Sequence, residues 1–448
     1  MSAAADKFSR LAALKPIRPM AARAAAIRTP GEEDTLGRLL GAGVATNHFG
    51  EHLLVRNWFS TPEFCEPSST TLELLSRTRD GARSRKSFAA LQDPEKWLFL
   101  DTETTGLAGG TGTYAFLIGL AWWDAGGLQV EQFFMRDFSE EHSLLQELSQ
   151  RVAERPVLVT FNGKSFDWPL LESRFTMTRS IAVPKLAAHL DLLHPARALW
   201  KLRLGSVRLV ELERRVLDAP RLGWHRENDV LSALIPQFYF DYLRGGPPQP
   251  LAGVVRHNQM DLRGLAALFG KINELLCGTP NALSEIGSLD LFGLSRFLQR
   301  RGENDRAHSA CAQALTIGLP EEIRPKACRE LAQMAKRRGE HARAAEIWLD
   351  LVTDPHDSIH ACEQLAIYYE RHVKDLAQAV HFAKLGLATL QRQQANSRDP
   401  FLMARVVRLE KNFRRRVARL ERKSRLSSPA QPRGGRAVGE PKASSELW

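Results

Sequence analysis

The sequence predicts an α/β domain followed by an all-α domain of helical repeats. Two short apolar runs, 97–100 and 157–161, have the length and composition of buried strands, and a helical pattern follows the second run. Apolar residues at helical spacing also mark the stretch 254–272, and similar helical segments repeat beyond residue 290. A chain of 448 residues with 44% hydrophobic residues is long and apolar enough for two or three packed domains.

The first predicted strand leads directly into a pair of acidic residues. Asp101 and Glu103 follow the apolar run 97–100, and the chain then enters Thr104-Thr105-Gly106-Leu107. Side chains alternate across a strand, so residues two apart point the same way, and two neighbouring carboxylates repel each other unless cations lie between them. Such hard oxygen ligands favour Mg²⁺ or Mn²⁺ over zinc. Taken alone, such a pair is more often a solvated turn.

Two later segments add to this pair. The second predicted strand is followed by Asn162-Gly163-Lys164-Ser165-Phe166-Asp167, which places Asp167 near the start of the next helix. The amphipathic helix farther on carries His257 and Asp261, which are four residues apart and therefore share one helix face. The chain thus supplies four candidate acids and a candidate base.

The order D-x-E-T-T-G-L, N-x-x-x-F-D and a helical residue four before an Asp resembles the three exonuclease motifs of the DEDD group, whose fold is ribonuclease-H-like. The segments 106–116, 189–195 and 257–261 are more specifically similar to the bacterial YprB-like proteins, and the similarity covers roughly residues 90–276. The resemblance implies a ribonuclease-H-like domain, with a mixed central sheet flanked by helices, at residues 91–278. It also implies that four acids hold two Mg²⁺ or Mn²⁺ ions: Asp101, Glu103, Asp167 and Asp261.

The same resemblance implies a metal-dependent nuclease, most specifically a 3′-5′ exonuclease acting on DNA or RNA. Two divalent ions about 4 Å apart can activate a water on one side of a phosphorus atom and stabilise the leaving oxygen on the other. Endonucleolytic or structure-selective cleavage would use the same chemistry, and no reader of the 2′-hydroxyl is recognisable, so these alternatives stay open. The rival hypothesis is a nucleic-acid-binding or protein-interaction scaffold with weak or no nuclease activity.

His257 departs from both common forms of the third motif. In one subgroup a His precedes the last Asp by five positions, and in the other a Tyr precedes it by four; here Arg256 and His257 occupy these positions. Because imidazole titrates near neutral pH, His257 is a candidate catalytic residue that orients or deprotonates the attacking water. The alternative is an ordinary half-buried helix histidine. Asp191, in a predicted strand at 190–193, is interpreted as an acceptor for nearby backbone donors and is left out of the metal set.

Three similar segments follow the nuclease domain and predict helical hairpins. They run 294–302, 331–339 and 365–374, and their last residues, Gly302, Gly339 and Lys374, are each followed five positions later by an alanine: Ala307, Ala344 and Ala379. The glycine would end one helix, and the alanine would let the next helix pack closely. The spacing resembles tetratricopeptide repeats, which implies a short solenoid whose concave face binds a protein partner or guides nucleic acid.

The net charge of +11 is concentrated at the two ends of the chain. Residues 405–425 read as one helix with ten basic residues and an apolar stripe on the opposite side. We expect the stripe to dock on the preceding helices and the basic face to meet phosphates. A solvated basic face without a ligand is the alternative. The helical repeats would then span residues 285–425.

The remaining segments are interpreted from their composition. We expect two disordered tails, a basic one at 1–30 and a Ser-, Pro- and Gly-rich one at 426–448, and an accessory segment at 31–90 with a possible strand at 51–58. No apolar run approaches the roughly 18 residues of a membrane span. The five cysteines are scattered and form no C-x-x-C pair, which fits a reducing cytoplasm. These features predict a cytoplasmic protein that has no membrane partner.

Overall fold

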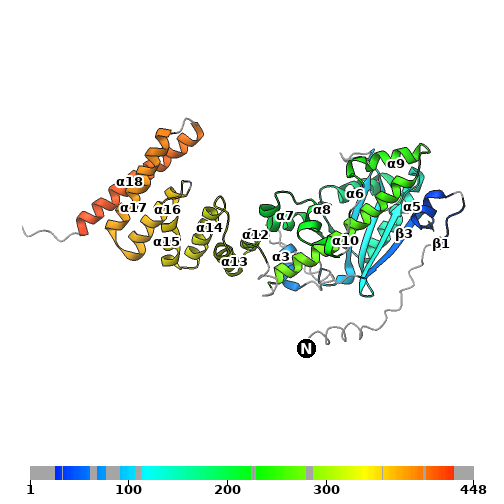
Figure 1. The fold of residues 1–448 in the computed structure, drawn as a ribbon, viewed down its shortest axis with the longest axis horizontal. Helices are drawn as coiled ribbons and strands as arrows, with labels where there is room; N and C mark the ends of the chain where they lie inside the picture. Colours follow the sequence, from blue (N-terminus) through cyan, green and yellow to red (C-terminus); the bar gives the residue numbers. More distant parts are fainter. Residues whose placement is uncertain are drawn as a thin grey trace, which may run out of the picture. The chain divides into compact units, whose positions relative to one another are not determined.

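The computed structural model divides the chain into two compact units, with the division between Ala310 and Cys311. The structure describes residues 26–32, 34–60, 68–76, 91–106, 112–222, 224, 226, 229–278, 286–355, 357–396 and 400–427. Figure 1 shows the helices and strands of both units.

In the described part of the first unit, eight strands form one sheet. Their order across the sheet is β1-β2-β3-β6-β5-β4-β7-β8. The strands are β1 (Ala26–Arg28), β2 (Gly43–Asn47), β3 (Gly50–Ser60), β4 (Trp97–Thr104), β5 (Ala115–Asp124), β6 (Gly127–Phe134), β7 (Val157–Thr160) and β8 (Ala188–Asp191). β4, β7 and β8 run parallel to one another, and the other neighbours are antiparallel. The predicted mixed sheet is therefore confirmed.

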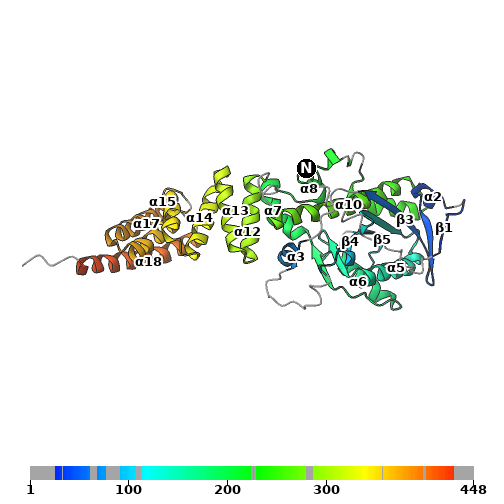
Figure 2. The same ribbon diagram turned by 90° about the horizontal axis from the view of Figure 1, so that it is seen from below.

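Helices cover both faces of this sheet. The long helix α10 (Gln249–Cys277) packs against β4, β5 and β6, and α5 (Glu141–Glu154) packs against β3. Figure 2 shows the sheet between α10 on one side and α5 and α6 (Asp167–Thr178) on the other. The unit also contains α2 (Thr35–Leu40), α3 (Ser69–Ser76), α7 (Leu193–Leu204), α8 (Leu209–Arg215), α9 (Ile235–Leu243) and α12 (Ser288–Arg300), and α13 (Asn304–Ile317) crosses the division.

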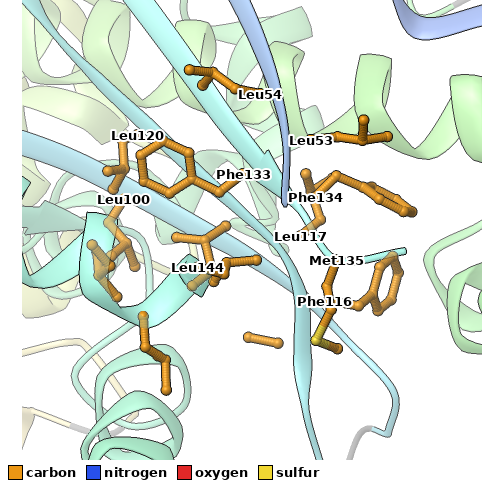
Figure 3. Packing of buried hydrophobic residues seen from close by; sticks show 14 of the residues in the cluster. Leu53, Leu54, Leu100, Phe116, Leu117, Leu120, Phe133, Phe134, Met135 and Leu144 are labelled. Carbon is orange, nitrogen blue, oxygen red and sulfur yellow. The ribbon is translucent and has the colours of Figure 1, made fainter. Parts of the chain in front are cut away.

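The buried strands at the centre of the sheet position the end of β4. Residues 97–100 of β4 and all of β7 are buried, as expected for strands that are covered on both faces. The largest apolar cluster includes Phe116 of β5, Phe133 of β6 and Leu144 of α5, part of which is drawn in Figure 3. Because this core holds the first half of β4 rigidly, the polar residues that follow leave the core at a defined place.

The first helix beyond Gly278 packs closely on the α/β unit. Gly278 ends α10 in the left-handed conformation, with φ of 72°. In α12, a Cβ atom added to Gly293 would lie 2.4 Å from the carbonyl oxygen of Leu199 in α7. A side chain there would therefore push the two helices apart. The glycine allows the backbones of α12 and α7 to pack in direct contact.

The rest of the described chain is helical, and the hairpin prediction is confirmed. Beyond α13 the helices are α14 (Arg324–Arg337), α15 (His341–Asp350), α16 (Ser358–Tyr368), a π-helical turn at Tyr369–Val373, α17 (Leu376–Asn396) and α18 (Pro400–Ser427). Gly302, Gly339 and Lys374 all have a positive φ after a helix, and Ala307, Ala344 and Ala379 are completely buried. The assignment to tetratricopeptide repeats stays a prediction.

Three expected boundaries need correction. The basic tail was expected to reach residue 30, but Ala26–Arg28 form the strand β1, which pairs with β2. The predicted strand at 190–193 ends at Asp191, because Leu193 already begins α7. The basic helix continues to Ser427, two residues past the predicted limit of 425. The predicted strand at 51–58 is confirmed within β3. Residues 1–25, 77–90 and 428–448 lie outside the described residues.

No helix among the described residues combines the length and the apolar character needed to cross a membrane.

Candidate active site

Three neighbouring strands form the floor of the candidate site. In the strand register, Asp101 of β4 lies opposite Gly119 of β5, and Gly119 lies opposite Gln132 of β6. The side chain of Asn258 enters from α10 directly above the glycine, where a Cβ atom would lie 2.1 Å from its Oδ1. Any larger residue at position 119 would therefore exclude the Asn258 side chain from the floor.

A chain of hydrogen bonds crosses this floor and orients Asp101. Gln132 Nε2 donates to Asn258 Oδ1 at 2.8 Å and to the carbonyl oxygen of Val255 at 2.7 Å. The first of these bonds fixes the orientation of the amide, so that Asn258 Nδ2 donates to Asp101 Oδ2 at 2.8 Å. Both Gln132 and Asn258 are fully buried, so the bonds are shielded from competing water.

Asp167 reaches the same region from α6. It begins that helix and accepts a hydrogen bond from Thr102 Oγ1 at 2.5 Å. Thr102 lies between Asp101 and Glu103 in β4, so this bond holds Asp167 beside the stretch of strand that carries the two acids. Asp191 has a different task, as expected: its carboxylate accepts from the backbone N–H groups of residues 162, 164 and 193, at 2.8 to 3.2 Å.

The candidate acids lie close enough to influence one another's protonation. Burial, followed by the charges of Asp261, Glu103 and Asp167, raises the pKa of Asp101 well above its ordinary value. Burial and the charges of Asp261 and Asp167 raise the pKa of Glu103 in the same way. Burial is also the main cause that raises the pKa of Asp167. The fold thus gathers β4, α6 and α10 carboxylates into one region of strong mutual repulsion.

His257 lies beside two of these acids. Its Nε2 is 4.0 Å from Glu103 Oε1 and 3.8 Å from Asp261 Oδ2, and its side chain is 8% exposed. Its Nδ1 is 2.8 Å from Asp229 Oδ1. Burial opposes ionisation of Asp229, but hydrogen bonds with Arg226 and His257 outweigh it and lower the pKa of Asp229. A carboxylate only accepts, so Nδ1 donates in this hydrogen bond, and Nε2 is the ring nitrogen that faces Glu103 and Asp261.

Arg226 brings a positive charge into the acidic region. Its guanidinium donates to both carboxylate oxygens of Glu213, at 2.6 and 2.7 Å, and to Asp229 Oδ2 at 2.9 Å. It also donates to Asp261 Oδ1. Glu213 comes close because residue 264 of α10 is glycine, where a Cβ atom would lie 2.0 Å from Glu213 Oε1.

The donor set suits a hard divalent cation, but the carboxylates are engaged with the protein. Carboxylate oxygens are the ligands that Mg²⁺ and Mn²⁺ prefer, and clustered carboxylates with raised pKa values are what a cation relieves. Within the part of the chain that the structure describes, however, no three His, Cys, Asp or Glu side chains have the spacing of a finished metal site. Asn258, Thr102 and Arg226 each donate a hydrogen bond to one of the acids.

The sequence reasoning missed most of the supporting residues. Asn258 left a signal, because it is a polar residue on the apolar side of an amphipathic helix. Gly119 left another, because an isolated glycine within a strand marks a close approach. No sequence pattern indicates a role for Arg226 or Asp229, since they lie in an irregular segment far from Asp261 in the sequence.

The chain was compared with known proteins. Residues 98–273 match the family described as the RNase_H superfamily. A relative from Bacillus subtilis (strain 168), named "Uncharacterized protein YprB", is 30% identical over 322 residues, which cover 70% of this chain and 74% of that protein.

The floor of the site generates one prediction about stability. We expect Gly119→Ala to lower the free energy of unfolding by about 1 to 3 kcal/mol, because the new methyl group collides with Asn258 and Leu262. Denaturant titration measures this change. Gly287→Ala is the control, since Gly287 has an ordinary φ of −68° and open space around it.

The cause of that loss is tested in a second background. Asn258→Ala removes one of the colliding groups, so Gly119→Ala should cost less there than in the natural chain. An equal cost in both backgrounds would show that the contact with Asn258 is not the reason.

Proposed function

Because this chain belongs to the YprB-like family of ribonuclease-H-like proteins, we propose that it is a nuclease that depends on divalent metal ions and hydrolyses phosphodiester bonds. The observation that carries the proposal is the convergence of four acids from three elements: Asp101, Glu103, Asp167 and Asp261. A cluster of half-buried carboxylates would repel a phosphate on its own, so its presence in a nucleic-acid-processing fold calls for cations.

These four acids would hold Mg²⁺ or Mn²⁺. When bound, such ions lower the pKa of a coordinated water and stabilise charge on the leaving oxygen. The protein's own contribution is to hold the ligand side chains in place. Asn258 and Thr102 hold Asp101 and Asp167 in fixed orientations, which limits the reorganisation that ligand binding requires.

His257 is the proposed catalytic histidine. Asp229 accepts a hydrogen bond from its Nδ1, and its Nε2 faces the acids, where it would accept a proton from a water molecule. In hydrolysis, the water oxygen forms a bond to phosphorus, the bond from phosphorus to the sugar oxygen breaks, and the water proton passes to a base such as Nε2. The leaving sugar oxygen takes up a proton from solvent water and ends as a hydroxyl group.

The resemblance of the three motifs supports a 3′-5′ exonuclease in particular. Such an enzyme would release nucleoside 5′-monophosphates from the 3′ end of DNA or RNA. The alternative, a scaffold that binds nucleic acid or a protein, draws on the helical repeats, whose stacked hairpins are a common protein-binding surface. End-labelled DNA and RNA, single- and double-stranded, distinguish these functions through the presence and the polarity of cleavage.

The proposed ligands are tested by isosteric replacement. Asp101→Asn and Asp167→Asn should each lower Mg²⁺-dependent hydrolysis by about 10³-fold or more, because each removes a charged metal ligand. Asp124→Asn, at the exposed far end of β5, is the control and should keep the natural rate. Undiminished hydrolysis in a folded Asp101→Asn protein would contradict the assignment.

His257 is tested separately. His257→Ala should lower the rate of hydrolysis by about 10²- to 10⁴-fold if the imidazole orients or deprotonates water. The control is His194→Ala, which changes an exposed histidine of α7. Equal rates in the two variants would make His257 a packing residue.

We further propose that Arg226 serves as an internal cation of the acidic region. Its bond to Asp261 neutralises one of the acids while the other carboxylates hold the guanidinium in place. The Asp261 oxygen that Arg226 occupies is then not available to another cation. Arg226 would therefore compete with metal ions for Asp261.

This competition has a direct test in metal binding. Arg226→Gln should bind Mn²⁺ about 10- to 100-fold more tightly than the natural protein, since a charge-assisted hydrogen bond of about 1.5 to 3 kcal/mol no longer competes. Calorimetry or Mn²⁺ electron paramagnetic resonance measures the affinity without any substrate. The double variant Arg226→Gln/Glu213→Gln avoids a buried unpaired carboxylate, and Arg256→Gln, which is exposed on α10, is the control. Unchanged or weaker affinity would make Arg226 a structural support only.

A further inference from the structure

Seven of the ten basic residues of α18 form two groups. One group forms ion pairs within the helical unit. Arg419 binds both carboxylate oxygens of Glu370, Lys423 lies 3.6 Å from the same carboxylate, and Arg416 lies 3.3 Å from Glu363. These acids belong to α16 and to the π-helical turn that follows it. Glu370 is buried, and its pairing with Arg419 lowers its pKa. This group therefore attaches α18 to the rest of the unit.

The second group makes a line along the exposed side of the same helix. We call it the outer stripe, and it consists of Arg408, Lys411, Arg415 and Arg422. All four residues are exposed, and within the described residues none of them has an acidic partner in an ion pair. At 1.5 Å per residue, the stripe is about 21 Å long.

The outer stripe lies opposite the apolar side of α18. Val406, Phe413 and Leu420 are buried, and the first two pack in a cluster with Cys362 and Leu390. Arg408, Arg415 and Arg422 follow these three residues by two positions each, which is a rotation of about 200° around the helix. The stripe therefore points directly away from the helical unit.

This geometry favours a polyanion over a membrane. An amphipathic helix binds a lipid surface by burying its apolar face in it. The apolar face of α18 is already used inside the protein, so only a row of charges remains available. A nucleic-acid strand presents a matching row of phosphates, and guanidinium groups bind phosphate with strong hydrogen bonds.

We propose that the outer stripe is a docking surface for the phosphate backbone of nucleic acid. The proposal rests on the proposed nuclease function in so far as nucleic acid is the substrate, and it adds a contact outside the α/β unit. The contact is with phosphates alone, so it contributes affinity without selecting sequence.

The test compares two charge-matched variants of the full chain. The stripe variant carries Arg408→Gln, Lys411→Gln, Arg415→Gln and Arg422→Gln. The control variant removes four exposed basic residues elsewhere in the same unit, through Arg324→Gln, Arg337→Gln, Arg371→Gln and Lys374→Asn. Binding of fluorescent DNA and RNA oligonucleotides is measured with EDTA present, over a range of salt concentrations, so that no hydrolysis is required.

The stripe variant should bind at least about tenfold more weakly than the natural chain and the control. The slope of log affinity against log salt should be smaller by about 3. Each phosphate contact contributes about 0.7 to 0.9 to this slope through counterion release, and the variant lacks four such contacts. A third variant, with the three stripe arginines changed to lysine, keeps the charge and should bind almost normally. Circular dichroism of the stripe variant, which should match that of the natural chain, checks that a loss of binding does not come from loss of folding.

The proposal would be overturned by a natural chain that does not bind nucleic acid, by an unchanged slope in the stripe variant, or by an equal loss in the control variant. Stripe-dependent binding to phosphatidylserine vesicles, with nucleic-acid binding unchanged, would overturn it in favour of a lipid surface. A natural chain that binds oligonucleotides but never hydrolyses them would instead count against the nuclease function and leave the docking surface supported.

Discussion

Neighbouring carboxylates repel one another, and much of the α/β unit is arranged around several half-buried ones held in one region. Burial raises the pKa of Asp101 and of Glu103, and the charges of the neighbouring acids raise it further. The protein offsets this cost with a separate donor for three acids: Asn258 for Asp101, Thr102 for Asp167 and Arg226 for Asp261. These donors come from a helix, a strand and an irregular segment, so the site forms only when the whole unit has folded.

Helix α10 contributes more residues to the site than any other element named above. It supplies Asn258, His257 and Asp261 within a little more than one turn, and its own glycine at position 264 admits Glu213. The strand below supplies the matching space at Gly119. In both places the absence of a side chain lets a polar group from another element approach the backbone. Packing and chemistry therefore depend on the same two glycines, one on each side of the helix–sheet contact.

The sequence predicts the elements better than it predicts the contacts between them. Strands 97–100 and 157–160 are recognisable because all their residues except Thr160 are apolar, and the hairpin alanines are recognisable because they recur at a fixed spacing. The roles of Arg226 and Asp229 depend on a segment without periodicity that meets α10 more than 25 residues later. The basic helix is predicted by its composition, but its division into paired and outer residues depends on acids from α16 and the next turn.

The two edges of the sheet are short. The eight-stranded order leaves β1 and β8 outermost, and these strands have only three and four residues. β1 is further tied to its own sheet by the Arg28–Glu51 ion pair that reaches across to β3. An edge strand exposes backbone N–H and C=O groups that another chain can pair with, and its length sets how many such bonds can form. Because both edge strands are short, a second copy of the chain can form few backbone hydrogen bonds with either of them. The unit can therefore keep a wide, rigid sheet and still resist self-association through its edge strands.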